Sequence, residues 1–93
     1  MSTEALLAER AKTHGDYSIH ARTTQALKRV LRTNAKYVES IHEPGTLSDE
    51  HREALDMILH KIGRILAGDA NFQDHWDDIA GYAKLASNAC VKP

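Results

Sequence analysis

The fold of this chain is decided by one stretch, Ser48-Asp49-Glu50-His51-Arg52-Glu53-Ala54-Leu55-Asp56-Met57-Ile58-Leu59-His60-Lys61-Ile62-Gly63-Arg64-Ile65-Leu66-Ala67-Gly68. Its apolar residues recur every three or four positions, as on an α-helix with one buried face: Leu55, Ile58, Leu59, Ile62, Ile65 and Leu66. Ser48 is a typical N-cap, and Gly68 is a natural C-terminal stop. We therefore predict a helix between these two residues, with its core stripe centred on Leu55.

Three further helices are expected on either side of this one, at about Glu4–Thr13, Ser18–Ile41 and Gln73–Asn88. The turn His14-Gly15-Asp16-Tyr17 separates the first two, with Asp16 or Ser18 as the cap of the second, and Asn71 is the expected cap of the last. The segment Glu43-Pro44-Gly45-Thr46 is a second turn. The sequence predicts a single all-α domain over residues 1–93, a helical hairpin or bundle of about four helices.

The composition narrows the class of protein. The chain has 93 residues and a formal net charge of -1, so no overall positive charge favours binding to a DNA or RNA duplex. A single cysteine, Cys90, gives no internal disulfide, and we find neither an apolar leader nor an apolar span. These features predict a cytoplasmic protein without a membrane partner. So short a chain buries a small core and is often helped by oligomerisation.

The predicted last helix has two faces of large side chains. Trp76, Ile79, Ala80 and Ala83 share one face, and His75, Asp78, Tyr82 and Leu85 share a nearly opposite one. A helix with two such faces is buried on both sides or pressed against another subunit, so we predict self-association. Gly81 lies in the middle of this helix, where glycine costs roughly 1 kcal/mol relative to alanine. It predicts that another element packs closely against the backbone there.

Three interpretations of the charged residues remain open. In the first, Lys61 and Arg64 form salt bridges with Asp77 or Asp78 that fix the hairpin, and the protein is a structural or interaction protein without a ligand. In the second, four carboxylates on two adjacent helices bind Mg²⁺ or Mn²⁺, which prefer oxygen ligands. These four are Glu50, Glu53, Asp74 and Asp77.

In the third interpretation the cations bind phosphate directly. Lys61 and Arg64, joined by Arg52, meet a phosphate group, Tyr17 or Tyr82 stacks on a base, and Asp78 orients the cations. The turn at His14–Tyr17 belongs to the same question, because glycine permits a left-handed backbone that turns its neighbours into a groove. Either it is a plain helix-breaking turn, or His14 and Tyr17 face the ligand. The six histidines have no zinc-ligand spacing.

The motifs His14–Tyr17, Glu53–Ile58 with Lys61 and Arg64, and Asp74–Leu85 resemble a family of small phage and prophage proteins. The resemblance covers about three quarters of the chain, is specific in the last helix, and is weak over residues 33–48. That family carries no established activity, so the resemblance implies a phage origin and, for a phage protein, the host cytoplasm.

A remoter similarity is to the MazG-like all-α NTP pyrophosphatases, whose Glu-x-x-Glu and Glu-x-x-Asp pairs bind the Mg²⁺ that holds a nucleoside triphosphate. One alignment matches Asp78–Tyr82 to the segment around the last aspartate. His75 then stands in place of the preceding glutamate, and Lys61 and Arg64 fall near the first acidic pair. The other alignment keeps acids at Glu50, Glu53, Asp74 and Asp77 but loses the match at Asp78–Tyr82. If the first is right, cations replace metal ligands, which favours phosphate binding without hydrolysis.

Our prediction is an oligomeric helical protein that binds a nucleotide or another phosphorylated small molecule without a cofactor, and in a phage sequesters a host signalling nucleotide as an anti-defence protein. The alternatives are an Mg²⁺-dependent NTP pyrophosphatase and a structural protein with paired charges. The predicted ligand-binding residues are His14, Tyr17, Lys61, Arg64, His75, Asp78 and Tyr82. Glu50, Glu53, Asp74 and Asp77 bind metal only if the pyrophosphatase alternative holds.

Overall fold

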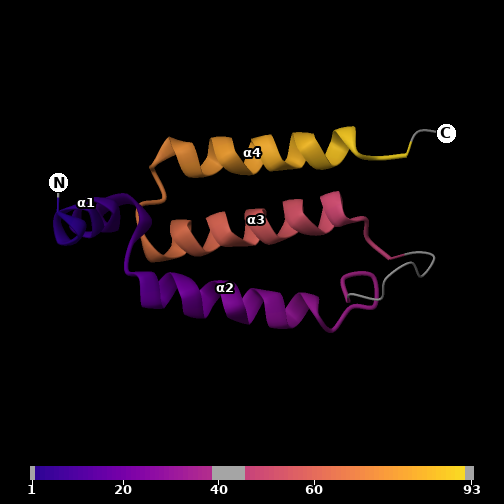
Figure 1. Ribbon diagram of the computed structural model, residues 1–93, viewed down its shortest axis with the longest axis horizontal. Helices are drawn as coiled ribbons and strands as arrows, with labels where there is room; N and C mark the ends of the chain where they lie inside the picture. Colours follow the sequence, from indigo (N-terminus) through magenta and orange to yellow (C-terminus); the bar gives the residue numbers. More distant parts are fainter. Residues whose placement is uncertain (1, 39–45, 92–93) are drawn as a thin grey trace.

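The computed structural model describes residues 2–38 and 46–91, and within these ranges every regular element is an α-helix. The helices are α1 (Thr3–His14), α2 (Tyr17–Leu31), α3 (Asp49–Ala67) and α4 (Gln73–Asn88). The predicted all-α fold is therefore confirmed. Figure 1 shows α3 in the middle of a layer, with α2 along one side and α4 along the other. In the described chain no Cα atom of α2 lies within 8 Å of one in α4, so these two helices pack against α3 and not against each other.

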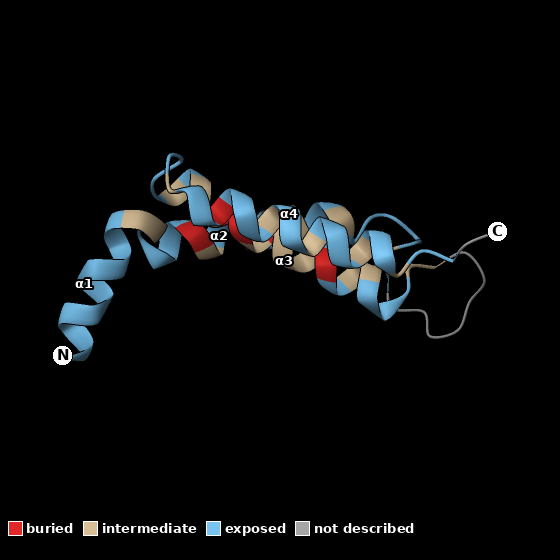
Figure 2. Cartoon of the chain, turned by 90° about the horizontal axis from the view of Figure 1, so that it is seen from above, coloured by how far each residue is buried: buried red, intermediate tan, exposed pale blue. Residues whose placement is uncertain are grey.

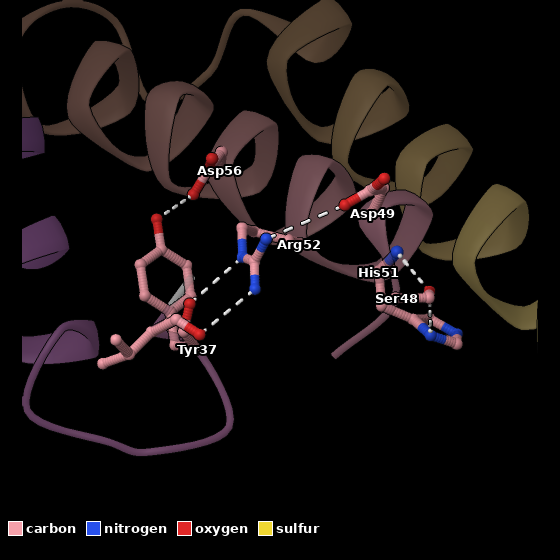
Figure 3. A network of polar contacts seen from close by, with 7 residues as sticks. Tyr37, Ser48, Asp49, His51, Arg52 and Asp56 are labelled. Atoms are coloured by element: carbon pink, nitrogen blue, oxygen red, sulfur yellow. Dashed lines mark hydrogen bonds and ion pairs between the residues drawn. The ribbon is translucent and has the colours of Figure 1, made fainter. Parts of the chain in front are cut away.

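The central helix α3 begins and ends where the sequence predicts. The hydroxyl of Ser48 accepts a hydrogen bond from the backbone N–H of His51 at 3.1 Å and lies 2.9 Å from Nδ1 of the same histidine (Figure 3). Across the layer, Nε2 of His51 donates to the carbonyl of Ala86 at 2.9 Å, which ties the start of α3 to the end of α4. At the other end, the N–H of Gly68 closes the helix on the carbonyl of Arg64.

Helix α2 is shorter than predicted, since it ends at Leu31 instead of continuing to Ile41. Side chains compete for the backbone after Leu31: the hydroxyl of Thr33 donates to the carbonyl of Val30 at 2.7 Å, and Oδ1 of Asn34 accepts from the N–H of Lys36 at 2.9 Å. Such local bonds favour turns over a continuing helix. Residues 39–41 of the predicted helix, and 43–45 of the turn after it, lie outside the described residues.

The segment after α2 is fastened to α3 by Arg52. Its Nε donates to the carbonyl of Tyr37 at 3.0 Å, and its other nitrogens reach the carbonyl of Val38 and the carboxylate of Asp49 (Figure 3). The hydroxyl of Tyr37 in turn donates to Asp56 of α3. The carbonyls of Tyr37 and Val38 lie beyond the end of α2 and accept no hydrogen bond within a helix. By satisfying them, Arg52 stabilises a chain in which α2 ends at Leu31.

Close packing of a helix against glycine occurs at Gly63 of α3, not at Gly81 as predicted. A Cβ atom at Gly63 would lie 2.4 Å from Oγ1 of Thr24 and 2.7 Å from Nδ1 of His20, both on α2. At Gly81 no heavy atom of the described structure lies within 4 Å of such a Cβ. The prediction for Gly81 was wrong because that side of α4 faces away from the layer, whereas Gly63 lies directly against two side chains of α2.

The core is smaller than predicted and has a different centre. Among the described residues, only Ala54 and Leu59 are buried apolar side chains, while Leu55 and Leu66 are exposed. The predicted stripe on α3 is wrong in its centre because α3 is covered on two opposite sides, by α2 and by α4. Leu55 lies on the side of α3 between those two, and this side faces out of the layer.

The remaining two helices, α1 and α4, add no buried apolar side chain among the described residues. Helix α4 begins after Phe72, and no side chain caps it, so the predicted cap at Asn71 was wrong. The N–H of Asn71 instead bonds to the carboxylate of Asp69, and the indole N–H of Trp76 donates to the carbonyl of Ala70 at 2.8 Å. Helix α1 extends away from the layer, and none of its residues is buried (Figure 2). No helix in the described ranges is long and apolar enough to cross a membrane.

Candidate functional site

The turn between α1 and α2 and the turn after α3 meet backbone to backbone. Gly15 has a φ of 76°, and a Cβ atom there would lie 2.0 Å from the carbonyl oxygen of Ala67. A Cβ at Gly68 would lie 2.4 Å from the carbonyl oxygen of Thr13. That same carbonyl accepts a hydrogen bond from the N–H of Asp69 at 3.0 Å. The two glycines therefore allow an approach that joins the last residues of α1 to the end of α3.

A cluster of three rings fills the space under this junction. His75, which is 1% exposed, donates from Nε2 to the carbonyl of Thr13 at 3.0 Å. Its ring lies edge-on to those of His14 and Phe72, with centroids 4.9 Å away in each case. His75 thus holds the start of α4 to the end of α1, and it supports His14 from below.

Above the junction lies a pocket of about 420 Å³, a size that suits a small molecule. Helix α1, the turn that follows it, the start of α2 and the second half of α3 all contribute to its wall. The lining residues are Leu7, Arg10, Ala11, His14, Gly15, Asp16, Tyr17, His20, His60 and Arg64. Two arginines and three histidines therefore surround one cavity, with a single carboxylate among them.

The arginines of this pocket have no ion-pair partner within the described ranges. The side chains of Arg10 and Arg64 lie on α1 and α3, and the three ion pairs found among described residues involve neither. Burial, together with the charge of Arg10, lowers the pKa of Arg64, whereas Asp78 and Tyr82 raise it. The only carboxylate of the pocket, Asp16, caps α2 by accepting from the N–H and hydroxyl of Ser18, at 2.7 and 2.8 Å.

The histidines of the pocket are held in their neutral form. Burial and then the charge of Arg64 lower the pKa of His14, of His20 and of His60, in the last case to about 4. A neutral imidazole can donate one hydrogen bond and accept another. The pocket thus offers fixed positive charge from the arginines and adaptable hydrogen bonding from the histidines, which is an arrangement suited to an anion.

The family comparison matches residues 1–90 to a domain of unknown function, DUF6378. The chain belongs to this family. The comparisons with curated proteins and with solved structures found no match. Membership in DUF6378 therefore gives no activity to transfer, and the chemistry of the site rests on its own residues.

Three of the predicted ligand-binding residues meet in the pocket of this DUF6378 protein, namely His14, Tyr17 and Arg64. His14 and Tyr17 flank one turn, whereas Arg64 lies on α3, so the meeting of Arg64 with the other two was not implied by spacing along the chain. Tyr17 is 80% exposed at the rim. Two others, His75 and Tyr82, lie outside the lining, and His75 is buried beneath it.

Lys61 and Asp78 form an ion pair, as in the first interpretation of the charged residues. Nζ of Lys61 lies 2.9 Å from Oδ2 of Asp78, and the hydrogen bond and charge of the lysine lower the pKa of that carboxyl group. The lysine side chain is 10% exposed. It joins α3 to α4 and does not reach the pocket, so its use as a phosphate ligand would require breaking this pair. The same interpretation paired Arg64 with an aspartate, and no such pair occurs in the described residues.

The sequence reasoning missed three arginine and histidine side chains of the pocket, Arg10, His20 and His60. A signal was available, because Arg10 and His14 are four residues apart on α1, and His60 and Arg64 are four apart on α3. Residues at this spacing share one side of a helix. Two basic pairs of the same type on different helices would have pointed to one shared cavity.

The four carboxylates of the metal alternative are not brought together. Helices α3 and α4 run antiparallel, and the pair Lys61–Asp78 marks the same level on both. Glu53 lies eight residues before Lys61, and Asp74 lies four before Asp78 in the opposite direction. At about 1.5 Å per residue, they are on the order of 18 Å apart along the layer. No group of three or more metal-binding side chains is gathered anywhere in residues 2–38 and 46–91.

A second hollow of about 520 Å³ lies at the other end of α2 and α3, lined by Lys28, Arg32, Tyr37, Val38, Arg52 and Asp56. Its Arg52 is committed to the carbonyls of Tyr37 and Val38, and Asp56 places a carboxylate inside it. The pocket at Arg10 and Arg64 is therefore the better candidate for an anion, since its arginines are free of such bonds.

Proposed function

We propose that this protein binds a phosphorylated small molecule, with a nucleotide as the favoured class, in the pocket between α1, α2 and α3. The observation that carries the proposal is that Arg10 and Arg64 line one cavity with no carboxylate paired to either among the described residues. Guanidinium groups present planar, forked donors that match the oxygens of phosphate. A phosphate between them would supply the missing counter-charge.

The remaining lining residues support this class of ligand. The charge of Arg64 helps to keep His14, His20 and His60 neutral, so a bound dianion would raise the pKa of each imidazole and strengthen its hydrogen bonds. Tyr17, exposed at the rim, offers a ring face on which a base can stack. Binding of a phosphate dianion is therefore coupled to proton uptake by these imidazoles, whose pKa values in the free pocket lie below 6.5.

Metal-independent binding follows from the same charges. In metal-dependent sites Mg²⁺ bridges protein carboxylates and phosphate, whereas here the positive charge is provided by the protein itself. The pyrophosphatase alternative needs a different site, with carboxylates from both α3 and α4 close together. Chelation of divalent cations separates the two functions, since it should leave the proposed binding intact.

The test is calorimetric titration with inorganic phosphate and with nucleoside mono-, di- and triphosphates, each with and without a chelator. We expect binding of at least one nucleotide in the presence of the chelator, and weaker binding as salt rises. Arg64→Ala should remove binding while the helical circular dichroism is unchanged. Arg29→Ala, an exposed arginine of α2 outside both hollows, is the matched control and should bind as the wild type does.

Two results would overturn the proposal. Equal loss of binding in Arg64→Ala and Arg29→Ala would mean that nonspecific charge is responsible. No binding of any phosphate compound would leave the pocket without its ligand and favour a protein that acts through its surface. The phage origin, the sequestering of a host signalling nucleotide as an anti-defence role and the host-cytoplasmic location stay predictions from the sequence.

A further inference from the structure

The layer of α2, α3 and α4 has two unlike faces. The pocket, Lys61 and Asp78 lie on one of them, which we call the polar face. Residues spaced by seven and then by four return to the same side of a helix. Two such sets lie on the opposite side of the layer: Ile19, Ala26 and Val30 of α2, and Leu55, Ile62 and Leu66 of α3. Trp76, Ile79 and Ala83 of α4 continue it, and these nine residues are the apolar face.

The contacts within the layer fix this assignment. On α3, Gly63 contacts α2 and Lys61 contacts α4, so these two residues mark the two covered sides of the helix. Leu55, Ile62 and Leu66 lie between the covered sides, on the surface of α3 opposite Arg64. On α4, Asp78 turns towards Lys61 on the polar side, and Trp76 and Ala83 lie on the other flank. None of the nine residues is charged, and none is buried in the single chain.

The exposed area is larger than that of an ordinary monomer. A folded monomer of 10.4 kDa exposes about 5,400 Å². This chain, with the protruding α1 included, exposes 6772 Å², an excess of about 1,400 Å². A standard interface removes about 800 Å² from each partner, so the excess is sufficient for one such interface. With two buried apolar side chains among the described residues, the single chain also lacks a core of normal size.

Charge indicates how two copies would meet. Helix α2 carries Arg22, Lys28 and Arg29 and no acidic residue, whereas α4 carries Asp74, Asp77 and one lysine besides Asp78, which is paired with Lys61 on the polar face. When two layers face each other about a twofold axis parallel to the helices, each α2 lies over the α4 of the partner. A twofold axis across the helices would place α2 over α2, basic helix against basic helix.

We propose that a second copy of this chain covers the apolar face, in a dimer whose twofold axis runs parallel to the helices. In this arrangement α3 of one copy lies along α3 of the other, in the same direction and in register. The apolar faces form the joint core, while both pockets remain on the outer, polar faces. The dimer thus holds two anion sites that open on opposite sides.

The first test measures the oligomeric state by sedimentation at micromolar concentration. We expect a dimer for the wild type and for Leu85→Glu, and a monomer for Leu66→Glu. The two leucines are matched, with 62% and 67% exposure in the single chain, but Leu85 follows Asp78 by seven residues and therefore shares its polar side. Circular dichroism on each variant separates loss of the dimer from loss of the helices. A monomeric wild type, or a dimeric Leu66→Glu, would overturn the proposal.

The second test fixes the direction of the axis. In a Cys90→Ser background, single cysteines replace Leu55 or Leu66, which lie about 16 Å apart along α3. A disulfide requires Cα atoms within about 7 Å. The parallel dimer predicts that each variant crosslinks to its own twin on mild oxidation. Crosslinks that form only when the Leu55→Cys and Leu66→Cys proteins are mixed would show the antiparallel axis and contradict the proposed arrangement.

Discussion

At the scale of single residues, the pair Lys61–Asp78 has an asymmetric role. The ammonium group is largely buried, whereas the carboxylate is about half exposed, with a side-chain exposure of 48%. Removing the carboxylate leaves a buried charge without a partner, but removing the ammonium leaves a carboxylate that water can solvate. The two halves of one ion pair should therefore differ in their effect on stability.

We expect Asp78→Asn to lower the melting temperature clearly and Lys61→Met to leave it nearly unchanged or raised. Methionine keeps the length of the lysine stem and needs no counter-charge. Thermal unfolding followed by circular dichroism gives both values. Equal destabilisation by the two substitutions would show that the ion pair itself, and not the burial of one charge, stabilises the layer.

The pair also shows what sequence reasoning could and could not give at this scale. A salt bridge from Lys61 to a neighbouring aspartate was one of three open interpretations, because its residues lie on helices expected to form a hairpin. The choice between Asp77 and Asp78 depended on the rotation of α4 about its axis, which periodicity alone does not determine. The same uncertainty misplaced the close helix contact at Gly81 instead of Gly63.

At the scale of elements, the contact between the two turns should be the least tolerant place in the chain. Gly15 combines a backbone conformation that other residues rarely adopt with a Cβ position inside the carbonyl of Ala67. Such backbone strain alone costs on the order of 1–3 kcal/mol. We expect Gly15→Ala to lower the unfolding free energy by more than about 2 kcal/mol, because the overlap with Ala67 adds to the strain.

The matched control is Gly81→Ala. Its site lies in the middle of α4, with open space around the position of the new methyl group. Alanine there should raise the unfolding free energy by roughly 1 kcal/mol, through helix propensity alone. Urea titrations compare the two variants. A tolerated Gly15→Ala would mean that α1 and the end of α3 separate easily, and the pocket geometry would then need another support.

The helices themselves were largely predictable. Ser48, Gly68 and Asp16 mark helix ends through local chemistry, and the structure places them as predicted. The error at α2 arose because apolar periodicity continued through Val38, while Thr33 and Asn34 redirected the backbone. The pocket could be predicted only in part, since His14, Tyr17 and Arg64 were identified, whereas Arg10, His20 and His60 enter it through the packing of three elements.

At the scale of the whole molecule, the neutral histidines make stability depend on pH. The pKa of His60 is about 4 in the folded protein, and those of His14 and His20 are also lowered from 6.5. The unfolded chain binds more protons between these values, so acid favours unfolding. The full stability is present above pH about 6.5 and is lost as pH falls towards 4.

Melting curves from pH 7.5 to 4.5, all at one ionic strength, test this dependence. We expect the melting temperature to fall continuously over the acidic half of that range. The variant His60→Gln should show a shallower fall, because its side chain does not titrate. A melting temperature that stays constant to pH 5 would mean that water reaches these imidazoles and that the arginines do not perturb them.

Helix α1 gives the pocket an equilibrium of its own. It provides Leu7, Arg10, Ala11 and His14 to the lining, yet none of its residues is buried. Segments with so little burial open locally at small cost, well below global unfolding. The pocket is complete only in those molecules in which α1 is docked. The apparent affinity for a ligand is therefore the intrinsic affinity multiplied by the fraction of molecules in this docked state. A ligand that bridges Arg10 and Arg64 would select the docked state, and occupancy of the site would be read out as order at the amino-terminal helix.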